Sequence, residues 1–222
     1  MQKPFFPAKT YPILLYLPSD YDTAESWPTI LYLHGMGAKG NYLEILKAHG
    51  LPRLLEKKDN FPFIVISPQC PENEEWSVAL LADVLNETAR QFRIDPDRIY
   101  LTGIGTGASA TWELAIAQPE RFAAIAPICG SGSPNTVCAL RDLPVWAFHG
   151  AKDKIIPISE AQGMILALKL CGGDVTFTVY PEAGHDSWTE AYNDPELYSW
   201  FLENRRLQFR EPVPDPAIAD LD

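Results

Sequence analysis

The chain has 222 residues, of which 46% are hydrophobic and 21% are charged, and its formal net charge is −11. This composition is typical of one globular domain with a sizeable core, and it excludes a disordered chain. The negative charge disfavours nucleic acid and anionic membrane surfaces as partners, because both are polyanions. No apolar run approaches the roughly 18 residues of a transmembrane helix. The N-terminal MQKP does not lead into the apolar region of a signal peptide, so we expect a cytoplasmic protein.

The four cysteines are scattered along the chain, at Cys70, Cys129, Cys138 and Cys171. They form no C-x-x-C pair and no cluster with histidine, which argues against a zinc site. We expect neither a metal nor a cofactor. Together with a cytoplasmic location, the spacing predicts that all four thiols are free.

Short apolar runs of strand type recur along the chain, with helical patterns between most of them. In Ser77–Phe92 the apolar residues recur at spacings of three, four and seven, as on one face of a helix. A capping box at Ser159 opens a later helix, which Gly172 closes, and Asp194 followed by Pro195 opens the last one. The expected strands are Pro12–Leu17, Thr29–Leu33, Phe63–Ser67, Arg98–Thr102, Ala123–Ile128, Val145–His149 and Val175–Tyr180.

Strands that alternate with helices predict an α/β fold with a mostly parallel sheet of about seven or eight strands and helices on both faces. We expect a single domain over residues 1–206, followed by a proline- and aspartate-rich tail over 207–222. In such sheets the functional residues gather in the loops at the carboxyl ends of the strands.

The stretch YLTGIGTGASATWELA, residues 100–115, enters a glycine-rich turn from a strand and leaves it as a helix. It fits the dinucleotide fingerprint G-x-G-x-x-G/A through Gly103, Gly105 and Ala108. It also fits the nucleophile elbow G-x-S-x-G through Gly103 and Gly107, with glycine instead of serine at 105. The fingerprint should follow the first strand, and an acidic residue should end the next one. Neither condition is met. A tight turn that needs small residues for packing remains a purely structural alternative.

The elbow interpretation requires an acid and then a histidine downstream, in loops that follow later strands. Asp153 follows the strand at 145–149 in VWAFHGAKDKIIP, and His185 follows the strand at 175–180 in VTFTVYPEAGHDSW. An early loop must also donate hydrogen bonds to an oxyanion, and HGMG after the strand at 29–33 has the required H-G-x-G form. The loops agree with the elbow in both order and residue type.

The chain resembles the α/β-hydrolase superfamily over Leu14 to Leu202. The resemblance rests on the segments LYLHGMG, RIDPDRIYLTG, HGAKDKIIP and YPEAGHDSWTEAY. The resemblance is to the branch of small bacterial serine esterases that includes feruloyl esterases, polyhydroxybutyrate depolymerases and dienelactone hydrolases. It implies an α/β-hydrolase fold, a small-molecule carboxylic ester as substrate, an acyl-enzyme mechanism and no cofactor.

The resemblance also implies a role for each site residue. Asp153 falls on the triad acid and His185 on the general base, while the backbone N–H groups of Met36 and Thr106 fall on the oxyanion donors. Gly105 falls on the nucleophilic serine, so the chain as it stands is expected to be inactive or crippled. Glycine adopts the strained elbow conformation without a Cβ penalty, so the scaffold should survive the loss. An engineered and a natural origin of this glycine both fit.

Other residues could take the place of the serine or of the acid. Thr106 and Ser109 are weak candidates for a surrogate nucleophile, and a water activated by His185 could support slow hydrolysis. Asp186, next to His185, is a rival for Asp153 as the acid. His34 and His149 more simply serve as structural residues that hydrogen-bond loop backbone.

Trp76 and Trp188 leave loops on the active edge of the sheet, so they are candidate walls of an acyl or aromatic pocket, with core packing as the alternative. No insertion long enough for a large lid lies between 128 and 144. The site should therefore be open and suit short or aromatic esters. A non-catalytic protein that binds a ligand in the same pocket is the alternative function. A peptidase of the related oligopeptidase branch ranks lower, because no gating domain is evident.

Overall fold

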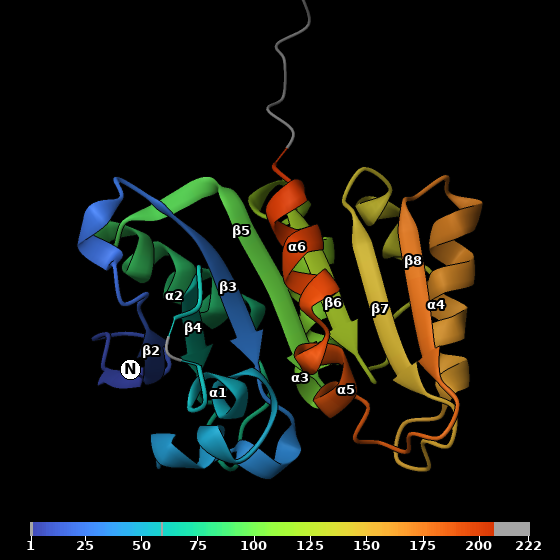
Figure 1. Ribbon diagram of the computed structural model, residues 1–222. Helices are drawn as coiled ribbons and strands as arrows, with labels where there is room; N and C mark the ends of the chain where they lie inside the picture. The colour runs from blue at the N-terminus through green and yellow to red at the C-terminus, as the bar shows by residue number, and fades with distance from the viewer. Residues whose placement is uncertain (1, 59, 207–222) are drawn as a thin grey trace, which may run out of the picture.

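The computed structural model describes residues 2–58 and 60–206, which fold around an eight-stranded sheet (Figure 1). The strand order is β1-β2-β4-β3-β5-β6-β7-β8. β1 and β2 run antiparallel to their neighbours, and all other pairings are parallel. This arrangement confirms the expected mostly parallel sheet. The strands are β1 Gln2–Phe5, β2 Ile13–Tyr16, β3 Trp27–Leu33, β4 Ile64–Pro68, β5 Ile94–Ile104, β6 Ala124–Ile128, β7 Val145–Gly150 and β8 Val175–Tyr180.

Helices cover both faces of the sheet, as Figure 1 shows. One core lies between the sheet and α2, α3 and α4, and a second lies between the sheet and α1, α5 and α6. Because both faces are covered, β3, β4 and β6 are buried at every residue. None of the helices within the described residues is long and apolar enough to cross a membrane. The helices are α1 Gly50–Leu55, α2 Val78–Gln91, α3 Thr106–Ala117, α4 Ile158–Leu170, α5 Trp188–Asn193 and α6 Pro195–Glu203.

Side chains cap the N-termini of α2 and α6, and the Asp194 cap of α6 is the one expected from the sequence. The Ser77 side chain accepts a hydrogen bond from the Leu80 N–H at 3.4 Å, and the Asp194 side chain accepts one from the Glu196 N–H at 2.9 Å. Each side-chain oxygen satisfies one of the N–H groups that the first helical turn leaves without a partner. The predicted starts of both helices are confirmed.

One whole strand and one helix start differ from the prediction, and β5 begins at Ile94, four residues before the expected strand. The edge strand β1 was not predicted, because QKPF carries no apolar run; it is held by pairing with β2 and by a hydrogen bond from the Gln2 side chain to Pro52 O at 2.9 Å. The predicted cap at Ser159 is wrong. α4 begins at Ile158, directly after Pro157, whose φ of −57° leads into the helix, so Ser159 lies inside the first turn.

The cysteine prediction is also wrong in part. Cys138 and Cys171 form a disulfide that links the turn before β7 to the end of α4, with their Cα atoms 5.5 Å apart. Cys70 and Cys129 are free and buried. The bonded pair is separated by 33 residues, and only the fold brings it together. Since disulfides persist in oxidising compartments, this bond weighs against the cytoplasmic location expected above.

We expect iodoacetamide in denaturant to label two cysteines without reductant and four after reduction, as read by mass spectrometry. Replacing both Cys138 and Cys171 with serine should lower the free energy of unfolding by about 3 to 4 kcal/mol, because a loop of this length then gains freedom in the unfolded chain. Changing the free Cys70 to alanine is the control for loss of a cysteine. Labelling of all four thiols without reductant would show that the disulfide does not form.

Candidate active site

Gly105 forms the turn between β5 and α3. Its φ is 54° and its ψ is −119°, which confirms the positive φ expected for an elbow residue. The Gly105 N–H donates to Ile128 O at 3.1 Å, which ties the turn to the end of β6. A Cβ placed on Gly105 would lie 3.3 Å from Nε2 of His185. The position of the missing side chain therefore directly faces the histidine ring.

The same turn lies against the end of β3 without intervening side chains. A Cβ placed on Gly107 would collide with the backbone carbonyl oxygens of Leu33 and His34. Glycine is required there for this close approach of two backbones. The contact brings the start of α3 beside the HGMG loop, as the elbow interpretation requires.

Asp153 and His185 form a hydrogen-bonded pair. Nδ1 of His185 lies 2.8 Å from Oδ2 of Asp153, which confirms the expected contact. Oδ1 of the same carboxylate accepts hydrogen bonds from the N–H groups of Ile155 at 2.8 Å and Ile156 at 3.0 Å. Because the carboxylate is an acceptor, Nδ1 carries the proton, and Nε2 is free to accept one at the position of Gly105.

Burial of Asp153 raises the pKa of its carboxyl group, but hydrogen bonds from His185 and from the two backbone N–H groups outweigh the burial, and the net pKa is lowered. The group is therefore a carboxylate at neutral pH. A buried negative charge at this distance favours the imidazolium that His185 would become on accepting a proton.

His149 lies at the end of β7 and contacts the Asp153–His185 pair. Its Nε2 lies 2.9 Å from Ile156 O and 3.3 Å from Oδ2 of Asp153, and its side chain is fully buried. The contact with backbone agrees with the structural role expected from the sequence. The contact with the Asp153 carboxylate was not foreseen, since the sequence gives only the (i, i+4) spacing and not the direction of the ring.

His34 is the first residue of the HGMG loop, and hydrogen bonds of His34 and Trp76 hold this loop in place. Nε2 of His34 accepts the Cys70 N–H at 3.0 Å, while its Nδ1 lies 2.6 Å from Gly35 O. Burial lowers the pKa of His34 to about 4, so the ring is neutral. The Trp76 indole N–H donates to His34 O at 3.3 Å and its ring packs against Tyr11. Trp76 is thus a buried core residue, and the alternative of an open substrate wall does not describe it.

The two expected oxyanion donors lie on the same edge of the sheet. Met36 begins a short 3-10 turn after β3, and Thr106 is the first residue of α3. N–H groups in the first turn of a helix have no partner within the helix and carry its positive end. The Gly35 Cα is 4.0 Å from the Cβ position at Gly105, so the HGMG loop borders the place that a side chain at residue 105 would occupy.

The candidate surrogates for the serine are occupied elsewhere or enclosed. The Ser109 hydroxyl lies 3.1 Å from the Ser131 hydroxyl and accepts the Ser131 N–H at 3.1 Å, so it faces the loop after β6. Oγ1 of Thr106 is buried and has no hydrogen-bond partner within the part of the chain that the structure describes. The rival acid Asp186 accepts hydrogen bonds from the N–H and the hydroxyl of Thr189 at the start of α5. None of these three side chains takes the expected place of the serine or of Asp153 beside His185.

The sequence indicated Cys129 only as one of four scattered cysteines and not as a candidate site residue. It follows β6 with a φ of 48°, and its Sγ lies within 4.8 Å of ligand atoms of Asp153 and His185. Burial raises the pKa of this thiol to about 12, so it stays protonated. A metal ion held by these three residues would have to displace the hydrogen bond between Asp153 and His185, so the observed contact does not favour metal binding by this group.

Trp188 lies beside the ring of His185. Its ring centroid is 5.4 Å from that of His185, and the two rings are nearly perpendicular. Because Trp188 is only half-buried, it stays a candidate for contact with a substrate.

Asp153→Asn should lower the free energy of unfolding at pH 7 by about 2 kcal/mol, since hydrogen bonds to a charged group contribute on that scale. The lowered pKa means that the carboxylate stabilises the fold above the usual Asp pKa of about 3.9 and loses this effect as the pH falls through its folded value. Urea unfolding from pH 7 to pH 3 should therefore show the two proteins converging. Asp186→Asn, which keeps an acceptor for Thr189, should cost less, and equal stability of Asp153→Asn and the parent at pH 7 would refute this account.

Comparison with known proteins gives one family match and several similar proteins. A family described as phospholipase/carboxylesterase matches residues 61–196. The chain is 23% identical to the bifunctional acetylxylan esterase/xylanase XynS20E of Neocallimastix patriciarum, over 92% of this chain and 31% of that protein. It therefore spans about a third of that relative's length.

Solved structures agree with this match. A thermostable esterase superposes with a TM-score of 0.78 and 27% identity, over 93% of this chain and 63% of the other. A ferulic acid esterase superposes with a TM-score of 0.67 over 90% of this chain and 95% of the other, and at 15% identity it supports the fold alone. The observed sheet is therefore that of the α/β-hydrolase fold.

Proposed function

Because this chain belongs to the phospholipase/carboxylesterase family, we propose that it has the active-site framework of a serine-type carboxylic ester hydrolase and lacks only the nucleophile. The observation that carries the proposal is the distance of 3.3 Å between Nε2 of His185 and the Cβ position at Gly105. An oxygen one bond beyond that Cβ would be within hydrogen-bonding reach of the ring.

With a serine at 105, each remaining group has a defined task. Nε2 of His185 takes the proton of the attacking hydroxyl and later returns it to the leaving alcohol, and Asp153 stabilises the imidazolium between these steps. The N–H groups of Met36 and Thr106 receive the oxyanion of the tetrahedral intermediate. With glycine at 105, a water at the same place is the nucleophile that His185 would activate, so hydrolysis is slow and passes through no acyl-enzyme.

The proposed substrates are short or aromatic esters. The segment between β6 and β7 contains only a short 3-10 turn, Val137–Leu140, so it does not build a large lid over the elbow. The similarity to an acetylxylan esterase points in the same direction, since an acetyl group is a short acyl group.

Gly105 itself favours one second candidate, a protein that binds an ester or an acid without cleaving it. A glycine at this turn carries no Cβ strain, so the fold does not depend on restoring the serine. In that case the Asp153–His185 pair contributes polar contacts to a ligand and no proton transfer.

Gly105→Ser should raise the rate of hydrolysis of p-nitrophenyl acetate or an aromatic ester by at least about 10³-fold, the scale of triad contributions. It should also make the protein react covalently with a serine-directed fluorophosphonate, with the adduct mapped to residue 105 by mass spectrometry. The parent should hydrolyse slowly without a burst and should give no adduct at this position.

Gly105→Ala is the matched control, because it adds the same Cβ beside His185 without the hydroxyl. Both variants should lose about 1 to 3 kcal/mol of stability, since each places a Cβ at a positive φ. Only the serine variant should gain activity. A folded serine variant that stays inert toward a broad ester panel and toward the fluorophosphonate would favour the binding protein over the esterase.

A further inference from the structure

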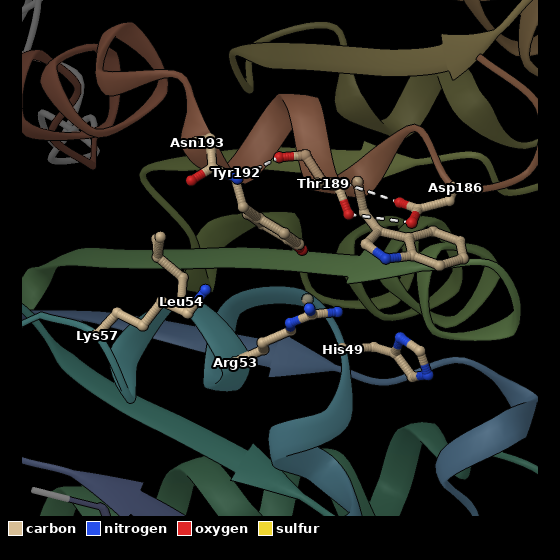
Figure 2. Close-up of a pocket in the computed structure, with 10 residues that line it drawn as sticks. His49, Arg53, Leu54, Lys57, Asp186, Thr189, Tyr192 and Asn193 are labelled. Carbon is tan, nitrogen blue, oxygen red and sulfur yellow. Dashed lines mark hydrogen bonds between the residues drawn. The ribbon is translucent and has the colours of Figure 1, made fainter.

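A pocket with a volume of about 280 Å³ lies beside the candidate active site, between α1 and α5. Figure 2 shows His49, Arg53 and Lys57 on the α1 side of this pocket and Asp186, Thr189 and Asn193 on the α5 side. Ligand sites for whole drug-sized molecules measure roughly 300–1,000 Å³. This pocket therefore suits one ring-sized portion of a ligand whose remainder lies elsewhere.

Trp188 connects the pocket with the catalytic edge of the sheet. Its ring lies 5.4 Å from the ring of His185 on one side and 6.3 Å from the ring of His49 on the other, measured between centroids. Trp188 also lines the pocket. A ligand with its ester carbonyl at Gly105 can therefore extend past the indole into this space.

The charged side chains that line the pocket carry a net positive charge. Arg53 and Lys57 both line it, and no carboxylate of residues 2–58 or 60–206 forms an ion pair with either of them. The Arg53 guanidinium has one long hydrogen bond, to Ala48 O at 3.5 Å. The single carboxylate in the lining, that of Asp186, already accepts two hydrogen bonds from Thr189. Both side chains are exposed, so a ligand in the pocket can reach them.

We propose that this pocket binds a carboxylate group carried by the ester, about one ring away from the scissile carbonyl. The Arg53 and Lys57 side chains contact the carboxylate, and the Trp188 ring contacts the group that connects it to the ester. The proposal rests on the proposed function for the position of the carbonyl, and it deepens that function by naming an acidic ester as the preferred substrate class.

The test uses the protein with Gly105, which should bind an ester without forming an acyl-enzyme. The probes are methyl 4-carboxybenzoate and methyl 4-carbamoylbenzoate, which share a shape and differ by one negative charge. Dissociation constants come from NMR titrations that follow the tryptophan indole N–H signals. The acid should bind about tenfold more tightly than the amide, which is the scale of two partly exposed ion pairs. The preference should shrink in 0.5 M NaCl, because exposed charges are screened.

The double variant Arg53→Gln with Lys57→Gln should abolish the preference and leave binding of the amide unchanged. Lys58→Gln is the matched control, since Lys58 is an exposed neighbour that does not line the pocket. It should retain the preference. Equal binding of acid and amide, binding of neither, or a preference that survives the double variant would overturn the proposal.

These outcomes are separate from those of the Gly105→Ser experiment. A serine variant that hydrolyses esters but does not discriminate between acid and amide refutes the acidic pocket and leaves the esterase proposal intact. A parent that prefers the acid, together with an inert serine variant, refutes the esterase and leaves a carboxylate-binding pocket.

Discussion

The candidate site depends on one steric constraint, the direct contact between the backbone of the β5–α3 turn and the end of β3. Any Cβ at Gly107 would meet the carbonyl oxygens of Leu33 and His34, so the two segments approach as closely as backbones can. This contact sets the start of α3 and the HGMG loop side by side. The HGMG loop, which contains Met36, and the start of α3, which contains Thr106, therefore lie together through packing of main chain, whichever side chain residue 105 carries.

The acid and the base are placed by a second, independent set of contacts in the loops after β7 and β8. The Asp153 carboxylate is fixed by two backbone N–H groups and by His149, and it in turn orients His185. Neither loop uses the side chain of residue 105 to hold its shape. The geometry of the Asp153–His185 pair is thus independent of the residue at position 105.

Much of this could be predicted from the sequence, because apolar runs mark the strands and the carboxyl ends of parallel strands share one edge. The expectation that Gly105, Asp153 and His185 meet at one edge followed from that rule together with the elbow motif and the acid-then-histidine order that the motif requires. The disulfide between Cys138 and Cys171 could not be predicted, since spacing along the chain does not give a distance in space. The sequence left the role of Trp76 open for a similar reason, because a tryptophan in a loop can either line a pocket or pack into the core. In the structure its indole N–H donates a hydrogen bond to His34 O, and the ring is buried. The pocket between α1 and α5 depends on helices far apart in sequence and was not foreseen.

The remaining residues do not carry equal weight in choosing between an esterase and a binding protein. Asp153 holds the loop that contains Ile155 and Ile156, so its presence is explained by structure whether or not the site catalyses a reaction. His185 is different. Its Nδ1 is held by Asp153, while its Nε2 faces Gly105 and has no hydrogen-bond partner among the residues that the structure describes. A ring nitrogen directed at the position of an absent hydroxyl contributes little to stability, so the orientation of His185 argues more strongly for an esterase framework than the acid does.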